Sequence, residues 1–233
     1  GDHRDLHISI RRQRQMCIRD RSKTYHHMKP VNVSHPIIYR DHFDFDVTQH
    51  SNIAEEMFGL VTKYDVATSV EVGETARSTA TTVSVPGYNY IANAVRMVPF
   101  VEYLKGKIQY LKQVWKIDDY PYFISNAWYN EHYEGDWTDE HAHGPCIVVS
   151  AYVKKPEGSG ELLVRYPMTE YRALELMNVE PWRRINVSQG DVIFFPGWLR
   201  HKTEPNYTKG RRLILSMNIT PAHSYDFDSP PTL

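Results

Sequence analysis

The segment from Gly190 to His201 reads Gly-Asp-Val-Ile-Phe-Phe-Pro-Gly-Trp-Leu-Arg-His. Its opening Gly190-Asp191 is typical of a turn, and the apolar run that follows predicts a buried strand that ends at Pro196-Gly197. His201 then lies on the next loop or strand. A single histidine in such a place is most often an ordinary side chain, so its meaning depends on which residues the fold brings beside it.

A histidine pair occurs upstream, in Glu140-His141-Ala-His143. Residues i and i+2 of a strand point to the same face, so both imidazoles can reach one metal ion. In a chain with 12 histidines, this pair alone is a weak signal. Together with His201 it supplies three nitrogen ligands on one side of an ion, which leaves coordination positions open for O₂ and a co-substrate.

The segment from Gly210 to Asn218 predicts another strand, Gly-Arg-Arg-Leu-Ile-Leu-Ser-Met-Asn. Alternation places Arg212, Ile214, Ser216 and Asn218 on one face and three apolar side chains on the other. Burying an arginine inside an apolar strand is costly unless an anion accompanies it. Two roles fit this pattern: a guanidinium fork that binds a substrate carboxylate through two hydrogen bonds, or an edge-strand arginine paired with a local carboxylate.

The order of these motifs resembles that of the iron(II)/2-oxoglutarate oxygenases, and most closely a branch found in marine bacterial and phage genomes. The resemblance covers roughly residues 120–220. The motifs that carry it are Ser125-Asn-Ala-Trp-Tyr-Asn130, Gly135-Asp136, His141-Ala-His143, Ser150-Ala-Tyr-Val153, Pro156, Gly158 and Gly160, Gly190-Asp191, Phe195-Pro-Gly-Trp-Leu-Arg-His201, Pro205-Asn206, Arg212 and Ser216-Met-Asn218. The ordered set is far more specific than any single member.

The resemblance implies a mainly β protein whose core is a double-stranded β-helix, also called a jelly roll or cupin-like fold. It implies that His141, the residue two further on and His201 hold Fe(II), and that Arg212 binds the distal carboxylate of 2-oxoglutarate. In this family O₂ is activated at the iron while 2-oxoglutarate is converted to succinate and CO₂. A C–H bond of the primary substrate is then oxidised, usually by hydroxylation.

This sequence departs from the family pattern at two positions. His143 stands where many members have a carboxylate ligand, which leaves one more positive charge on the site. Asp139 and Glu140 are close enough in sequence to act behind the histidines or to substitute as a ligand. Ile214 stands where many relatives have a small hydroxyl residue that assists the arginine.

Other side chains are therefore expected to complete the co-substrate site. Those that the motifs suggest are Asn130, Tyr152 and Ser216. Ordinary packing within strands is the alternative role for all three. Aromatic residues near the expected mouth include Tyr129 and Trp137, and those assigned to a substrate pocket are Trp128, Tyr133 and Trp198. Packing in the core or at the rim is their alternative role.

We divide the chain into a disordered or non-native basic extension (1–30), a helical support region with a possible lid loop (31–120), the catalytic core (121–221) and a tail (222–233).

Two helices are expected. The first spans 49–64, with Asn52 as its cap and Glu55 completing a capping box, and the second spans 97–115 and covers a sheet. Residues 68–90 predict a short strand or the lid. Strands are expected at 121–130, 146–154, 160–166, 182–187, 191–195 and 211–219. Hairpin turns are expected at 158–160 and 189–191.

Bulk composition narrows the classes of partner. The chain has 233 residues, 41% of them hydrophobic, which suffices for a packed core. A net charge of −1 gives no attraction to nucleic acid, and no apolar run has the roughly 18 residues that a membrane span needs. Two distant cysteines, Cys17 and Cys146, favour a reduced, cytoplasmic protein. Composition leaves the primary substrate and the oligomeric state open.

Two other classes fit parts of the pattern. A three-histidine cupin dioxygenase would not need 2-oxoglutarate, and Gly135-x5-His141-x-His143 with Gly190-x5-Pro196 and His201 follows much of the two cupin motifs. The glutamate usual in the first motif is missing, and Arg212 with the closing Ser-Met-Asn favours the 2-oxoglutarate oxygenase. The other alternative is a non-enzymatic β-helix that binds a metal or a small molecule.

Overall fold

The computed structural model describes residues 37–63, 72–80, 91, 94–117, 120–165 and 181–222. The expected basic extension, residues 81–90 of the possible lid and the tail beyond residue 222 lie outside these ranges.

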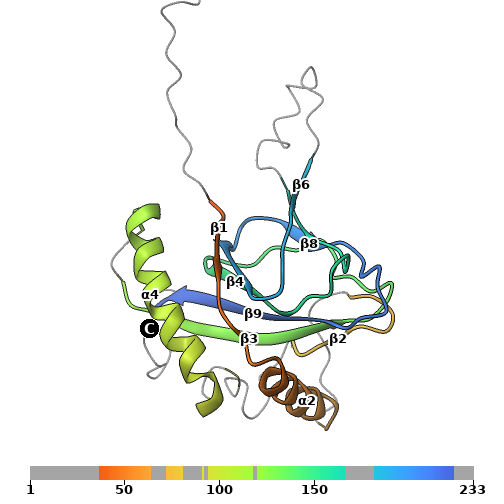
Figure 1. Cartoon of the computed structure of the whole chain (residues 1–233). Helices are drawn as coiled ribbons and strands as arrows, with labels where there is room; N and C mark the ends of the chain where they lie inside the picture. Colours follow the sequence, from red (N-terminus) through yellow and green to blue (C-terminus); the bar gives the residue numbers. More distant parts are fainter. Residues whose placement is uncertain are drawn as a thin grey trace, which may run out of the picture. The chain divides into compact units, whose positions relative to one another are not determined.

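Strands of the described residues form two antiparallel sheets (Figure 1). The larger sheet has the order β1 (Tyr39–His42), β7 (Asp191–Pro196), β4 (Ile147–Lys154), β9 (Arg212–Pro221), β3 (Tyr122–His132) and β2 (Arg77–Ser78). The smaller sheet has the order β6 (Trp182–Ile185), β5 (Leu162–Arg165) and β8 (His201–Thr203). An isolated antiparallel bridge between His141 and His201 brings the segment before β4 against β8.

The alternation of side chains along the larger sheet separates two apolar clusters. From β7 and β9, Phe194, Leu213 and Leu215 join the cluster that packs against the helices. Their neighbours Phe195 and Ile214 join the second cluster, which also holds residues of β5. β7 and β9 therefore have both faces buried, one under helices and one against the smaller sheet, as the two-layer packing of a β-helix requires.

Two helices cover the outer face of the larger sheet. α2 spans Val47–Lys63, and α4 spans Val98–Trp115 after a short 3₁₀ turn, η2 (Val95–Met97). α4 lies across β3 and β9 in Figure 1, and its buried side chains belong to the outer cluster. The helix predicted at 97–115 is confirmed.

The predicted cap of the first helix is wrong. α2 begins at Val47, and the side chain of Asp46 accepts a hydrogen bond from the backbone N–H of Gln49 at 2.9 Å. Asn52 lies inside the helix, one turn beyond the true start, and Glu55 forms an ion pair with Arg77 instead of a capping box. A short acidic residue satisfies the free N–H groups of a first turn as well as Asn does.

All six predicted strands are present, and no strand end differs from its predicted position by more than two residues. The turns at 158–160 and 189–191 are also present, and Gly158, Gly160 and Gly190 have positive φ angles of 76°, 78° and 89°. They are not hairpins, because β4 and β5 lie in different sheets, as do β6 and β7. The short strand β2 falls within 68–90, whereas β1 was not predicted.

Candidate metal centre

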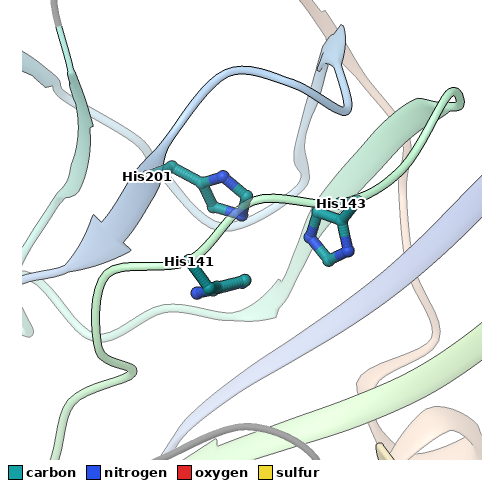
Figure 2. A group of neighbouring side chains, drawn as sticks. All are labelled: His141, His143 and His201. Carbon is teal, nitrogen blue, oxygen red and sulfur yellow. The ribbon is translucent and has the colours of Figure 1, made fainter.

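Three histidines converge between the two sheets. His141 and His143 lie on the connection from β3 to β4, and His201 is the first residue of β8. Reciprocal backbone hydrogen bonds of 3.0 Å between His141 and His201 hold the two segments together. One ring nitrogen from each residue lies within 4.8 Å of the others, and Figure 2 shows the rings turned toward a common space.

Hydrogen bonds behind the rings leave the ligand nitrogens free. Nδ1 of His141 lies 2.6 Å from the carbonyl of Asp139, and Nδ1 of His201 lies 2.8 Å from that of Leu199. A carbonyl can only accept, so these Nδ1 atoms carry hydrogen, and the Nε2 lone pairs of the neutral rings are available to a metal. Nε2 of His143 is buried and has no hydrogen-bond partner among the described residues.

Burial also keeps the three imidazoles uncharged. It lowers the pKa of His143 to about 4 and moves the pKa values of His141 and His201 below the usual range, with the other rings of the cluster adding to the effect on His143 and His201. Neutral imidazole is the form that binds a metal, and the donor set suits a borderline first-row ion such as Fe(II). The residues present therefore fit the iron that the family pattern implies.

In the part of the chain that the structure describes, no carboxylate joins the three histidines. The side chain of Glu140 instead forms ion pairs with Arg165 at 3.0 Å and with Arg200. Asp139 supports His141 through its backbone carbonyl, while its carboxylate accepts a hydrogen bond from the backbone N–H of Glu140. An ion held here would retain its full charge of about +2 because all three ligands are neutral.

A small cavity adjoins the histidines, and its wall is partly polar. The predicted residues Trp128, Asn130 and Ser216 line it. So do three hydroxyl residues that were not predicted, namely Thr138, Ser150 and Thr203. Thr203 could have been found from its position two residues after His201, which puts it on the same face of β8.

Arg212 lies behind this wall. Its side chain is fully buried on β9, an inner strand, so the edge-strand alternative is wrong. The guanidinium donates to the carbonyl of Ser159 through Nη1 and, through Nη2, to the carbonyl of Glu204 at 3.0 Å and the hydroxyl of Thr203 at 3.1 Å. No carboxylate within the described ranges forms an ion pair with it.

Gly160 makes room for this arrangement. A Cβ atom at Gly160 would meet Nη1 of Arg212 at 2.9 Å and would collide with the carbonyl oxygen of Pro205. Its φ of 78° is also one that residues with a side chain rarely adopt. A glycine is needed here both for the turn and for the close approach of backbone and guanidinium.

Tyr152, another predicted residue, lies opposite Ile214 in the register of β4 and β9. Its hydroxyl and that of Ser159 are buried without a hydrogen-bond partner among the described residues. Burial raises the pKa of Tyr152 to about 12, with the charge of Arg212 opposing the shift, so the phenol is a neutral donor. Tyr152 does not line the cavity of the histidines.

The predicted aromatic residues separate into two groups. The ring of Trp128 lies 5.6 Å from that of His143, and its indole N–H is buried without a partner in the described part of the chain. Tyr133 donates to Glu131 at 3.0 Å, and Trp198 is 57% exposed; neither lines the cavity. Tyr129 points to the helix side, where its hydroxyl lies 2.8 Å from His50, so its expected place near the mouth is wrong.

Comparison with known families agrees with this geometry. Residues 126–218, which contain all three histidines and Arg212, match a family described as "Putative 2OG-Fe(II) oxygenase". This part of the chain is therefore similar to 2OG-Fe(II) oxygenase domains. The family uses Fe(II), 2-oxoglutarate and O₂. Among curated proteins, none matches the sequence.

Solved structures of the same family resemble the domain at low sequence identity. The non-heme alpha ketoglutarate dependent epimerase SnoN from nogalamycin biosynthesis is 12% identical with a TM-score of 0.51, over 80% of this chain and 79% of that one. This likeness shows the shared double-stranded β-helix.

Two prolyl hydroxylases align over a similar range. A prolyl-4-hydroxylase of Pseudomonas putida is 10% identical, with a TM-score of 0.49, over 79% of this chain and 92% of that one. The viral collagen prolyl hydroxylase of Paramecium Bursaria Chlorella virus-1 is 15% identical, with a TM-score of 0.48, over 79% of this chain and 96% of that one.

In the ranges that the structure describes, no helix is both long and apolar enough to cross a membrane.

Proposed function

We propose that the chain is an Fe(II)- and 2-oxoglutarate-dependent dioxygenase that hydroxylates a C–H bond of its substrate and releases succinate and CO₂. The observation that carries the proposal is the set of three converging, neutral imidazoles beside a buried arginine that has no described carboxylate partner. The first feature suits a metal ion with open coordination positions, and the second suits a carboxylate ligand.

His141, His143 and His201 would hold the iron through Nε2, with the carbonyls of Asp139 and Leu199 fixing two of the rings. Bound iron and 2-oxoglutarate would supply the activation of O₂. Arg212 would supply the positive charge that favours the distal carboxylate of 2-oxoglutarate in the interior. The apolar side chains Val148, Leu162 and Ile214 would exclude water from the space between the two groups.

The test is an anaerobic titration of the metal-free protein with Fe(II) and then with 2-oxoglutarate, followed through the weak visible band of the chelated co-substrate. The wild type should develop the band. His143→Ala should lose it together with iron affinity, and Arg212→Ala should keep iron affinity but need at least ten-fold more 2-oxoglutarate. His42→Ala and Arg96→Ala, at positions outside the site, are the matched controls and should titrate as the wild type does.

The outcomes separate the alternatives. Iron binding without a band would overturn the use of 2-oxoglutarate and favour a three-histidine dioxygenase of the cupin type. Absence of iron binding would favour a non-enzymatic protein. When the band does form, consumption of O₂ with stoichiometric succinate would establish the reaction, and a substrate search would follow the release of hydroxylated product.

A further inference from the structure

Arg212 does not face the cavity beside the histidines, but two threonines that do face it are linked to the guanidinium. Nη2 of Arg212 donates to the hydroxyl of Thr203 at 3.1 Å. Nε of Arg212 donates to Nδ1 of His132 at 3.3 Å, and Nε2 of His132 lies 2.8 Å from the hydroxyl of Thr138. The positive charge is therefore connected to the cavity wall by a direct path and by a path through one imidazole.

The direction of each hydrogen bond follows from the chemistry of the donors. Arginine N–H groups only donate, so Nδ1 of His132 must accept. His132 is fully buried, and burial, together with the charge of Arg212, holds its pKa well below the usual range. The neutral ring then carries its hydrogen on Nε2 and donates it to the hydroxyl oxygen of Thr138.

The hydroxyl of Thr203 has both of its lone pairs engaged. It accepts from Nη2 of Arg212 and also from the backbone N–H of Thr138, at 2.8 Å. A hydroxyl has two lone pairs and one hydrogen, so the remaining interaction of Thr203 is donation. No acceptor for either threonine hydroxyl occurs among the described residues, and both residues line the cavity.

We propose that Thr138 and Thr203 donate directly to the distal carboxylate of the co-substrate, and that the buried His132 is a positioning residue that orients Arg212 and Thr138 for this. The inference rests on the proposed function and names the donors that replace the small hydroxyl residue missing at Ile214. Donation from hydroxyls polarised by a cation suits a dicarboxylic 2-oxo acid and disfavours one that ends in a methyl group.

Two other observations support a positioning role for His132. The amide nitrogen of Asn206 donates to the carbonyl of His132 at 3.1 Å, which holds the end of β3 against the loop before β9. The carbonyls of Ser159 and Glu204 accept from the two outer nitrogens of Arg212. The guanidinium is thus held on three sides, and removal of the His132 acceptor would release the side that leads to Thr138.

The test compares two ligands in the same anaerobic titration of the iron-loaded protein. 2-Oxoglutarate carries the distal carboxylate, whereas 2-oxopentanoate has a methyl group in its place and the same chelating end. We expect Thr138→Val, Thr203→Val and His132→Gln to weaken 2-oxoglutarate about 10- to 100-fold, the range for one lost hydrogen bond to a charged group. The affinity for 2-oxopentanoate should change less than about two-fold, since it lacks the charged group.

The controls distinguish positioning from a general loss of structure. Thr203→Ser retains the hydroxyl and should restore 2-oxoglutarate affinity. Thr220→Val and His50→Gln remove buried groups of the same kinds elsewhere and should leave the preference between the two ligands unchanged.

Equal weakening of both ligands, or unchanged affinity for 2-oxoglutarate in the three site variants, would overturn the inference. Failure of the proposed function gives a different result, because the wild type would then show no band with 2-oxoglutarate.

Discussion

The two faces of β9 contain different kinds of side chain although both are buried. Toward the helices the strand presents Leu213, Leu215 and Met217, which belong to one continuous apolar cluster. Toward the smaller sheet it presents Arg212, Ile214 and Ser216. The space there also holds hydroxyl groups, histidines and polar atoms that have no partner within the described ranges. The difference indicates that the outer face stabilises the fold and the inner face holds the site.

The cost of the inner face is reduced by local hydrogen bonds. A buried polar group without a partner costs about 1–3 kcal/mol, and a buried charge costs more. Arg212 is accordingly surrounded by acceptors, and two of the metal-site histidines donate to carbonyls. The groups that have no partner among the described residues, such as Nε2 of His143 and the hydroxyl of Tyr152, lie where the family pattern expects ligands.

The largest effect is expected from Leu215→Ala, which should lower the stability of the fold without changing the metal site. The side chain is fully buried in the outer cluster, and truncation of such a leucine lowers the free energy of unfolding by about 2–5 kcal/mol. Urea denaturation would measure the loss. The folded variant should bind Fe(II) with wild-type affinity, and a more than ten-fold weakening would show that the outer face also shapes the site.

The sequence predicted the strands of the core and the three histidines because strand periodicity and metal-ligand spacing are local patterns. It did not predict β1, a four-residue strand in which half-buried and exposed residues alternate and whose pairing with β7 depends on a partner about 150 residues away. The change of sheet at 158–160 was missed for the same reason. A glycine turn looks the same whether the next strand returns to its own sheet or crosses to the other.

Sequence motifs predicted the metal-site histidines and Arg212, but not the residues that connect them. Nothing near His132 in the sequence indicates a contact with Arg212, which lies 80 residues away. Thr138 likewise depends on His132 for its role. Hydrogen bonds between distant residues have no period or spacing, so these positions become visible only when the fold is known.

The free energy of unfolding is expected to depend on pH through His50, which is buried next to the outer cluster. Burial lowers its pKa from 6.5 to about 4. Between these values the unfolded chain binds a proton that the folded chain does not. The contribution of His50 to the free energy of unfolding is therefore complete above pH 6.5 and is lost as the pH decreases toward 4. The contribution is about 3 kcal/mol.

Urea denaturation at a series of pH values would measure this contribution against a His50→Gln variant. The variant should lose about 3 kcal/mol less than the wild type between pH 6.5 and 4, while the slope due to the buried histidines of the inner face remains in both. Identical pH profiles for the two proteins would show that His50 does not contribute.

The effect confined most closely to the surroundings of Arg212 is expected from Gly160→Ala. The backbone at this position has a φ of 78°, and the added methyl group would collide with the carbonyl oxygen of Pro205 and press on Nη1 of Arg212, 2.9 Å away. The strain of the backbone costs about 1–3 kcal/mol, and the collision with Pro205 adds to it. The guanidinium would be displaced, so 2-oxoglutarate should bind more weakly while Fe(II) affinity is retained.

Gly158→Ala is the matched control, because its φ of 76° gives the same backbone strain but its Cβ would meet only a methyl group of Thr208, at 3.6 Å. If only Gly160→Ala weakens 2-oxoglutarate, the cause is the crowding of Pro205 and Arg212 and not the strain of the turn. Equal weakening in both would attribute the loss to the turn and would remove Gly160 from the site.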